Sequence, residues 1–209
     1  TNIQAQIVMV RQNEHLLFVS TTDQLTRLKN RHSLQAYLFS ESRRIANTLE
    51  RKNELLKYTV AFMDMDRFKF YNDTYGHNAG DFMLSCFASL LKSEARKNDF
   101  VARYGGDEFV IVMADTDEKE AEIFRKRIWI GLQKENFFVP KLKSFLNVEK
   151  LDITEEQFLG FSMGLCSNCD VEDPSDLVSV MDNADKALYH VKENSKGGIA
   201  YWKNIRKKS

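Results

Sequence analysis

Arg103-Tyr104-Gly105-Gly106-Asp107-Glu108-Phe109 is the stretch that decides the fold. It separates two apolar runs, residues 100–102 and 109–113, which is the pattern of a β-hairpin. The adjacent glycines allow positive φ angles and a close approach of the backbone to a ligand. Asp107 and Glu108 stand at the turn, so the stretch predicts a hairpin that presents two carboxylates to a metal–phosphate site.

Composition limits the possible classes of protein. The chain has 209 residues, of which 43% are hydrophobic and 29% charged, as expected for one globular domain. Lys plus Arg and Asp plus Glu number 30 each, so net charge does not favour nucleic acid as a partner. No apolar run approaches the ~20 residues of a membrane span, and no secretory signal opens the chain. The sequence begins at Thr1, which leaves room for a membrane anchor in a longer protein.

Cysteine usage indicates a reducing compartment. The chain has three cysteines, an odd and low count that is typical of intracellular proteins. Cys166 and Cys169 form one CxxC pair with no second pair to complete a zinc site, so they are interpreted as plain thiols. We therefore expect a cytoplasmic domain.

Hydrophobic periodicity predicts alternating helices and strands. Helices are expected at about 1–20, 31–53, 79–97, 118–135 and 174–191, and strands at 58–65, in a hairpin over 99–114, at 158–165 and at 198–202. This order predicts an α+β fold, a central, mostly antiparallel sheet flanked by helices in a ferredoxin-like layout. Residues 1–20 are expected to be an N-terminal helix, either a short coiled-coil seam or a helix lying on the domain. Residues 21–209 would form that domain, in which 136–157 show no clear period and are interpreted as an insertion.

The strand at 58–65 runs into two carboxylates, Asp64 and Asp66. Alternation places Val60, Phe62 and Asp64 on one face of the sheet. Mg²⁺ prefers oxygen ligands of this kind and usually shares them with phosphates. The alternative is that one of the two aspartates caps the following turn.

The stretch from Phe68 to Asp81 combines a cation with a possible base-reading pair. Lys69 is a mobile point charge suited to phosphate. The Asn72 amide can donate and accept hydrogen bonds, and the Asp81 carboxylate can accept from the N1–H and 2-amino groups of guanine. Turn and cap chemistry around the neighbouring glycines is the simpler interpretation of the same residues.

Two further charged pairs are candidates for anion binding. Lys192 and Lys196 are four residues apart, so on a helix they would share one face. Their charges either interact favourably with the helix dipole or bind a polyphosphate. Arg96 and Asp99 precede the hairpin, and their simplest interpretation is a surface ion pair.

Taken together, these motifs resemble the GGDEF domains of bacterial diguanylate cyclases. The resemblance covers residues 21–202 and rests on blocks spread along the chain. The matching blocks are Asp23-x-Leu25-Thr26-x-Leu28-x-Asn30-Arg31, the residues between Asp64 and Asp81, the namesake block at 103–109, Ser162-Met163-Gly164, and Ala184-Asp185-x-Ala187-Leu188-Tyr189-x-x-Lys192.

The resemblance implies a palm-type nucleotidyl cyclase that condenses two GTP molecules into cyclic di-GMP across a homodimer and releases two pyrophosphates. It implies the following site residues: Asp64, the carbonyl of Met65 and Asp107 as ligands of Mg²⁺ or Mn²⁺; Asp107, Glu108 and Lys69 as catalytic groups; Phe68, Lys69, Lys192 and Lys196 for the phosphates; Asn72 and Asp81 for guanine. Lys196 stands where the family usually has Arg, which loses the planar fork of guanidinium.

The resemblance also implies regulation. Arg96 and Asp99 fall at the family's inhibitory site, where the cyclic di-GMP product would bind, and residues 1–20 would continue from an upstream sensor or receiver domain. Two alternatives stay open: a catalytically weak module that binds cyclic di-GMP or GTP and signals to a partner, and a palm-type cyclase or polymerase with another substrate. The Asn72–Asp81 pair and the lack of a basic excess disfavour the second.

Overall fold

The computed structural model describes residues 6–8, 20–133, 137–194 and 197–206. The expected helix at 1–20 therefore lies mostly outside the described residues, and so does Lys196. None of the described helices is long and apolar enough to cross a bilayer.

In the part of the chain that the structure describes, five strands form one sheet in the order β2-β3-β1-β4-β5. They are β1 (Tyr58–Asp66), β2 (Phe100–Gly105), β3 (Glu108–Ala114), β4 (Gly160–Ser167) and β5 (Ile199–Tyr201). The pairs β2–β3, β3–β1 and β1–β4 are antiparallel, and β4–β5 is parallel. The predicted α+β class with a mostly antiparallel sheet is confirmed.

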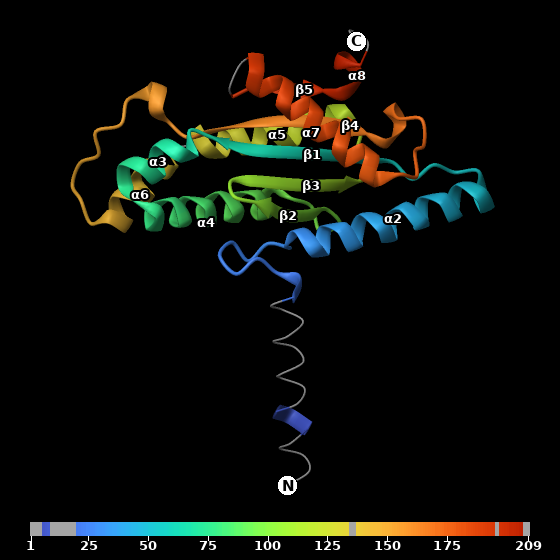
Figure 1. Ribbon diagram of the computed structural model, residues 1–209, viewed down its shortest axis with the longest axis horizontal. Helices are drawn as coiled ribbons and strands as arrows, with labels where there is room; N and C mark the ends of the chain where they lie inside the picture. The colour runs from blue at the N-terminus through green and yellow to red at the C-terminus, as the bar shows by residue number, and fades with distance from the viewer. Residues whose placement is uncertain (1–5, 9–19, 134–136, 195–196, 207–209) are drawn as a thin grey trace.

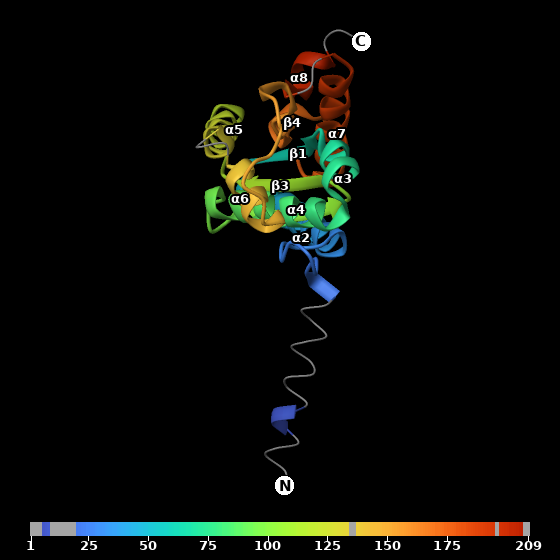
Figure 2. The same ribbon diagram turned by 90° about the vertical axis from the view of Figure 1, so that its left-hand side faces the viewer.

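Helices cover both faces of this sheet (Figures 1 and 2). The described helices of four or more residues are α2 (Arg31–Lys52), α3 (Phe68–Tyr75), α4 (His77–Glu94), α5 (Glu118–Gln133), α6 (Phe138–Leu146), α7 (Leu177–Asn194) and α8 (Trp202–Ile205). Short 3-10 turns, η2 (Glu155–Gln157) and η3 (Asn168–Asp170), flank β4.

The strand alternation of β1 separates two cores. Ala61, Met63 and Met65 pack into a cluster with α4, α5 and α6, whereas Val60 and Phe62 pack into a second cluster with α2 and α7. Asp64 has the same parity as Val60 and Phe62 and contacts α7, so the face assigned to it from the sequence is confirmed.

Three α-helices among the described residues were not expected from the sequence: α3, α6 and the short α8, which begins inside the strand expected at 198–202. α3 occupies a stretch where no helix was expected, and α6 occupies part of the 136–157 segment that showed no clear period. In both, burial of aromatic or aliphatic side chains offsets poor helix propensity: Tyr71 is buried in α3, and Phe138 and Leu142 are buried in α6.

The remaining differences are at element ends. α7 begins at Leu177 and not near Pro174, because the Asp176 carboxylate accepts hydrogen bonds from the amides of Val178 and Ser179 and so caps the helix. It ends at Asn194, before the position of Lys196. Phe82, in the helix expected at 79–97, is half-buried and stacks on Phe145.

Candidate active site

The namesake turn lies against the end of β1. The amide of Met65 donates to the carbonyl of Asp107 at 3.2 Å, and Asp64 faces Glu108 in the β1–β3 register. The turn itself depends on Gly106, whose φ of 51° lies in the left-handed region that favours glycine. The structure thus brings together three of the predicted site residues: Asp64, Met65 and Asp107.

Lys192 reaches this cluster from α7. Its Nζ donates to Asp64 Oδ2 at 2.7 Å, and the Asp64 side chain is only 12% exposed. Burial opposes the charge of Lys192, but the hydrogen bond and the carboxylates of Asp64, Glu108 and Asp107 outweigh it and raise the lysine pKa. Lys192 therefore stays a cation beside the carboxylates that the sequence assigned to a metal.

The carboxylates themselves are crowded. Burial raises the pKa of Asp64 to about 6, and the charges of Asp107 and Asp66 push in the same direction, against the opposing effect of Lys192. Burial also raises the pKa of Glu108 and of Asp185. Negative charge is thus concentrated at one end of the sheet, where an added cation would be favourable.

The donor set fits a hard divalent cation bound together with a phosphate. Among the described residues, no three His, Cys, Asp or Glu side chains converge on a point as a complete protein cage would require. Mg²⁺ does not need one, because it is usually bound through one or two carboxylates, water and substrate phosphates. Asp64 and Asp107, with the carbonyl of Met65 beside them, are the groups that would hold it.

A second part of the candidate site lies on the α3–α4 helix pair. Arg67 precedes α3 with a φ of 63°, a left-handed conformation that is rare for a residue other than glycine. The first amides of α3, at Phe68 and Lys69, have no carbonyl four residues back within the helix, as at any helix start, so they can receive an anion. Lys69 itself is exposed.

Gly80 connects Asn72 with the helix that carries Asp81. A Cβ at Gly80 would lie 1.8 Å from Asn72 Oδ1 and 3.2 Å from the Phe68 ring, so the Asn72 amide is in contact with the backbone of α4. Asp81 follows Gly80 directly and is exposed. The predicted base-reading pair therefore comes from adjoining turns of two packed helices.

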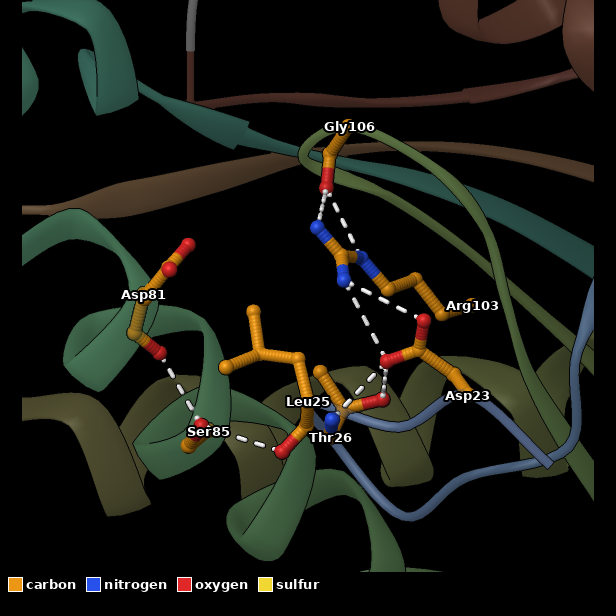
Figure 3. Close-up of polar contacts among 7 residues, drawn as sticks. All are labelled: Asp23, Leu25, Thr26, Asp81, Ser85, Arg103 and Gly106. Carbon is orange, nitrogen blue, oxygen red and sulfur yellow. Dashed lines mark hydrogen bonds and ion pairs between the residues drawn. The ribbon is translucent and has the colours of Figure 1, made fainter. Parts of the chain in front are cut away.

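The turn at residues 21–30, here called the N-terminal turn, joins both parts of the site (Figure 3). Arg103 donates to both carboxylate oxygens of Asp23, at 3.2 and 3.3 Å, and through Nε and Nη2 to the carbonyl of Gly106. Asp23 also accepts from the amide and hydroxyl of Thr26. The carbonyl before Asp107 is thus tied to the start of the domain.

The other end of the same turn reaches α4. Ser85 Oγ lies 3.4 Å from the carbonyl of Leu25 and 2.9 Å from that of Asp81, as Figure 3 shows. The sequence interpretation gave Asp23 only a cap or turn role, named Arg103 only as part of the namesake block, and did not single out Ser85. The signal available was an Arg and an Asp in two separate motif blocks, each without an assigned partner.

Arg96 and Asp99 meet in a tight turn and not as a simple ion pair. The Asp99 carboxylate accepts from the amide of Arg96 at 2.7 Å, and burial raises its pKa. The turn borders a groove of about 550 Å³. The cationic residues lining that groove are Arg27, Lys29, Lys92, Arg96 and Lys97.

Comparison with known proteins identifies the family of the chain. The family described as "Diguanylate cyclase, GGDEF domain" matches residues 20–197. Diguanylate cyclase A of Treponema denticola is 32% identical over 97% of this chain and 50% of its own length. Diguanylate cyclase DosC of Escherichia coli K12 is 33% identical over 87% of this chain and 35% of its own. The chain thus spans half or less of these relatives.

A solved structure shares the same architecture. The coiled coil and GGDEF domain of DgcB from Caulobacter crescentus, crystallised with c-di-GMP, superposes with a TM-score of 0.70 at 25% identity and covers 96% of this chain and 95% of its own. The family match extends over most of the sequence and includes the hairpin turn, the end of β1 and the α3–α4 pair. The chain belongs to the GGDEF-domain family of diguanylate cyclases.

Proposed function

We propose that this chain condenses two molecules of GTP into cyclic di-GMP and two pyrophosphates, with one GTP held by each of two copies. The observation that carries the proposal is the hydrogen bond between Met65 and Asp107. It sets the namesake turn against the end of β1, with Asp64 and Lys192 alongside. Carboxylates and a cation side by side support this proposal, because binding of a triphosphate with a metal needs both.

In this proposal the residues divide the work of positioning. Asn72 and Asp81 bind the guanine edge, and the first amides of α3 with Lys69 bind phosphate oxygens. Lys192 and Lys196 hold the outer phosphates. Asp64, the Met65 carbonyl and Asp107 would hold Mg²⁺ or Mn²⁺, which neutralises charge on the phosphates when bound; Glu108 supports the same network.

The reaction is an in-line transfer between two bound nucleotides. The 3′-oxygen of one GTP forms a bond to the α-phosphorus of the other, and the bond from that phosphorus to the bridging oxygen of pyrophosphate breaks. Asp107 takes the proton of the attacking hydroxyl. The same transfer in the opposite sense closes the ring, so each protomer supplies half of the site.

The test is incubation of the chain with GTP and Mg²⁺, followed by identification of the product. We expect cyclic di-GMP from the wild type, none above background from Asp107→Ala, and wild-type turnover from the exposed control Asp182→Ala. ATP should be used at least ~10⁴-fold less efficiently, because adenine gives Asp81 no donors. Comparable use of ATP would refute the guanine assignment, and GTP binding without turnover would favour the regulatory-module alternative.

We further propose that the Arg96–Asp99 turn binds the cyclic di-GMP product and inhibits the enzyme. The cationic groove beside the turn supports this, since it would attract the product's phosphates. Arg96→Ala should weaken product inhibition at least ~10-fold, because a charge-assisted contact is lost. Lys52→Ala, at the far end of α2, serves as the control. An unchanged inhibition constant in Arg96→Ala would contradict the assignment.

We also propose that residues 1–20 connect this catalytic domain, residues 21–209, to an upstream signalling segment of a longer cytoplasmic or membrane-anchored protein. The short coverage of the relatives supports this, as does the coiled coil in the DgcB structure.

A further inference from the structure

Residues 137–159, here called the outer segment, wrap around the α3–α4 helix pair. α6 lies beside α4 at the end of the sheet where α3 also sits (Figures 1 and 2). Phe138 and Leu142 enter the core with exposures of 4% and 0%. The Phe145 ring stacks on Phe82 of α4, with centroids 4.5 Å apart and planes 14° from parallel. The outer segment is therefore packed onto the helices and is not a loosely attached insertion.

The far end of the outer segment makes two hydrogen bonds to α3 and its start. The hydroxyl of Tyr71, a residue only 1% exposed, donates to the carbonyl of Gln157 at 2.9 Å. The guanidinium of Arg67 donates to the carbonyl of Phe158 at 3.1 Å. The second bond tethers the residue whose left-handed backbone begins α3.

These three contacts fall next to the candidate substrate residues. Arg67 is two positions before Lys69, Tyr71 directly precedes Asn72, and Phe82 directly follows Asp81. The Asn72 amide also contacts α4 at Gly80, so a small shift between the helices would change the separation of Asn72 and Asp81. The C-terminal end of the outer segment is hydrogen-bonded to α3 and its start, and α6 of the same segment packs on α4.

We propose that the outer segment is a specificity element: it holds Asn72 and Asp81 at the spacing that reads guanine. Tyr71, Phe82 and Phe145 are then positioning residues that touch no substrate. The inference rests on the proposed function, because it assumes that this pair binds the base. Hydrogen-bond selectivity needs donors and acceptors held in place, so a loosened pair should lose discrimination as well as affinity.

The inference is tested with Tyr71→Phe, which removes the bond to Gln157, and Phe145→Ala, which removes the stacked ring. Matched controls are Tyr201→Phe, which loses the hydroxyl bond from β5 to Glu122 of α5, and Phe39→Ala, which removes a ring of α2 that is 65% exposed. The probes are the α,β-methylene analogues of GTP and of inosine triphosphate, with Mg²⁺, in calorimetric titrations. Inosine lacks the 2-amino group, from which the Asp81 carboxylate would accept a hydrogen bond.

We expect both variants to bind the guanosine analogue about 5- to 10-fold more weakly than the wild type does. The ratio of their affinities for the guanosine and inosine analogues should fall by about threefold. Both controls should keep the wild-type affinities and the wild-type ratio. Equal weakening of both analogues, or no change in either variant, would overturn the specificity role.

Hydrogen–deuterium exchange without nucleotide reads the same contacts independently of binding. Amides of residues 68–85 should exchange faster in Tyr71→Phe and Phe145→Ala than in the wild type and both controls. Unchanged exchange overturns the inference and leaves the proposed function standing. A wild type that binds neither analogue overturns the proposed function, and the specificity role with it.

Discussion

Asn72 owes its position to the absence of a side chain at Gly80. Because a Cβ there would lie 1.8 Å from Asn72 Oδ1, the amide can rest on α4 only if residue 80 is glycine. This glycine is therefore explained by a close approach between two helices and not by backbone conformation. It was predicted from the sequence only as part of a turn.

Gly80→Ala should stabilise α4 intrinsically but displace the Asn72 amide. We expect affinity for a non-cleavable GTP analogue to fall about 10-fold, as a hydrogen bond to the base is lost, with little change in the unfolding temperature. Gly131→Ala is the matched control, since its Cβ would meet only the tip of Leu90 at 2.8 Å. Unchanged nucleotide affinity in Gly80→Ala would contradict a role for Asn72 in binding.

Asp23 links stability to pH. Burial works against its charge, but hydrogen bonds from Thr26 and the charge of Arg103 outweigh it and lower the pKa of Asp23 from its ordinary value of 3.8. A depressed pKa contributes stability above the unfolded value, and that contribution is lost as pH falls through the folded value. Asp23→Asn should therefore be less stable than the wild type by roughly 1 kcal/mol near neutral pH.

The stability difference between wild type and Asp23→Asn should shrink as pH drops below 3.8. Urea unfolding at a series of pH values measures it, with Asp182→Asn expected to follow the wild type. A difference that widens toward acid would show that the ionised Asp23 does not stabilise the fold.

At the scale of elements, α7 and β4 meet through Gly164. An added Cβ there would lie 2.0 Å from the carbonyl of Ala184 and 2.2 Å from the amide of Leu188. These are backbone atoms on the buried face of α7, so no side chain can rotate aside to make room. The close contact also fixes α7, which presents Lys192 to Asp64.

Gly164→Ala should push α7 away from the sheet and lower the free energy of unfolding by roughly 2–4 kcal/mol. Denaturant unfolding measures the loss. Gly160→Ala on the same strand is the control, because its nearest neighbour would be 3.4 Å away. Equal stability of the two variants would argue against tight packing at this contact.

The strands and long helices were predictable because their apolar periods are strong. The strand alternation of β1 identified the face of Asp64, and the glycines identified the hairpin. α3 was missed because aromatic residues, Asn and Thr favour helices weakly, and tertiary burial of Tyr71 overrides that preference. In α6, Phe138, Leu142 and Phe145 do follow a helical spacing, and Pro140 lies within the first turn, where it is tolerated.

Contacts between distant segments were not predictable. Residue types and spacing singled out the carboxylates, the lysines and the Asn–Asp pair as candidates, and the resemblance to the family gave them metal, phosphate and base roles. The bonds of Arg103 to Asp23 and of Tyr71 to Gln157 join residues 80 and 86 positions apart. No local pattern encodes such pairs.

For the whole molecule, the sheet separates two cores, and the candidate site lies at one end of β1 beside both. If each protomer holds one GTP, catalysis requires two such ends to meet. The initial rate should then rise with the square of protein concentration while the dimer is the minor species. Initial rates over a dilution series measure this.

A mixing experiment separates this dependence from simple inactivation on dilution. Excess Asp107→Ala should lower the activity per wild-type chain by pairing with it, whereas excess bovine serum albumin should not. A rate that stays proportional to wild-type concentration in both series would indicate that one chain suffices.

The N-terminal turn has a consequence for where this domain starts. A fragment beginning at Arg31 would keep every candidate catalytic side chain, yet it would lack Asp23 and Leu25, whose bonds reach Arg103 and Ser85. The β2–β3 hairpin and α4 would then lose the segment that is hydrogen-bonded to both of them. The domain therefore needs residues that precede all of its candidate catalytic side chains in the sequence. A truncation chosen from the catalytic motifs alone would remove the turn that holds the hairpin and α4 in position.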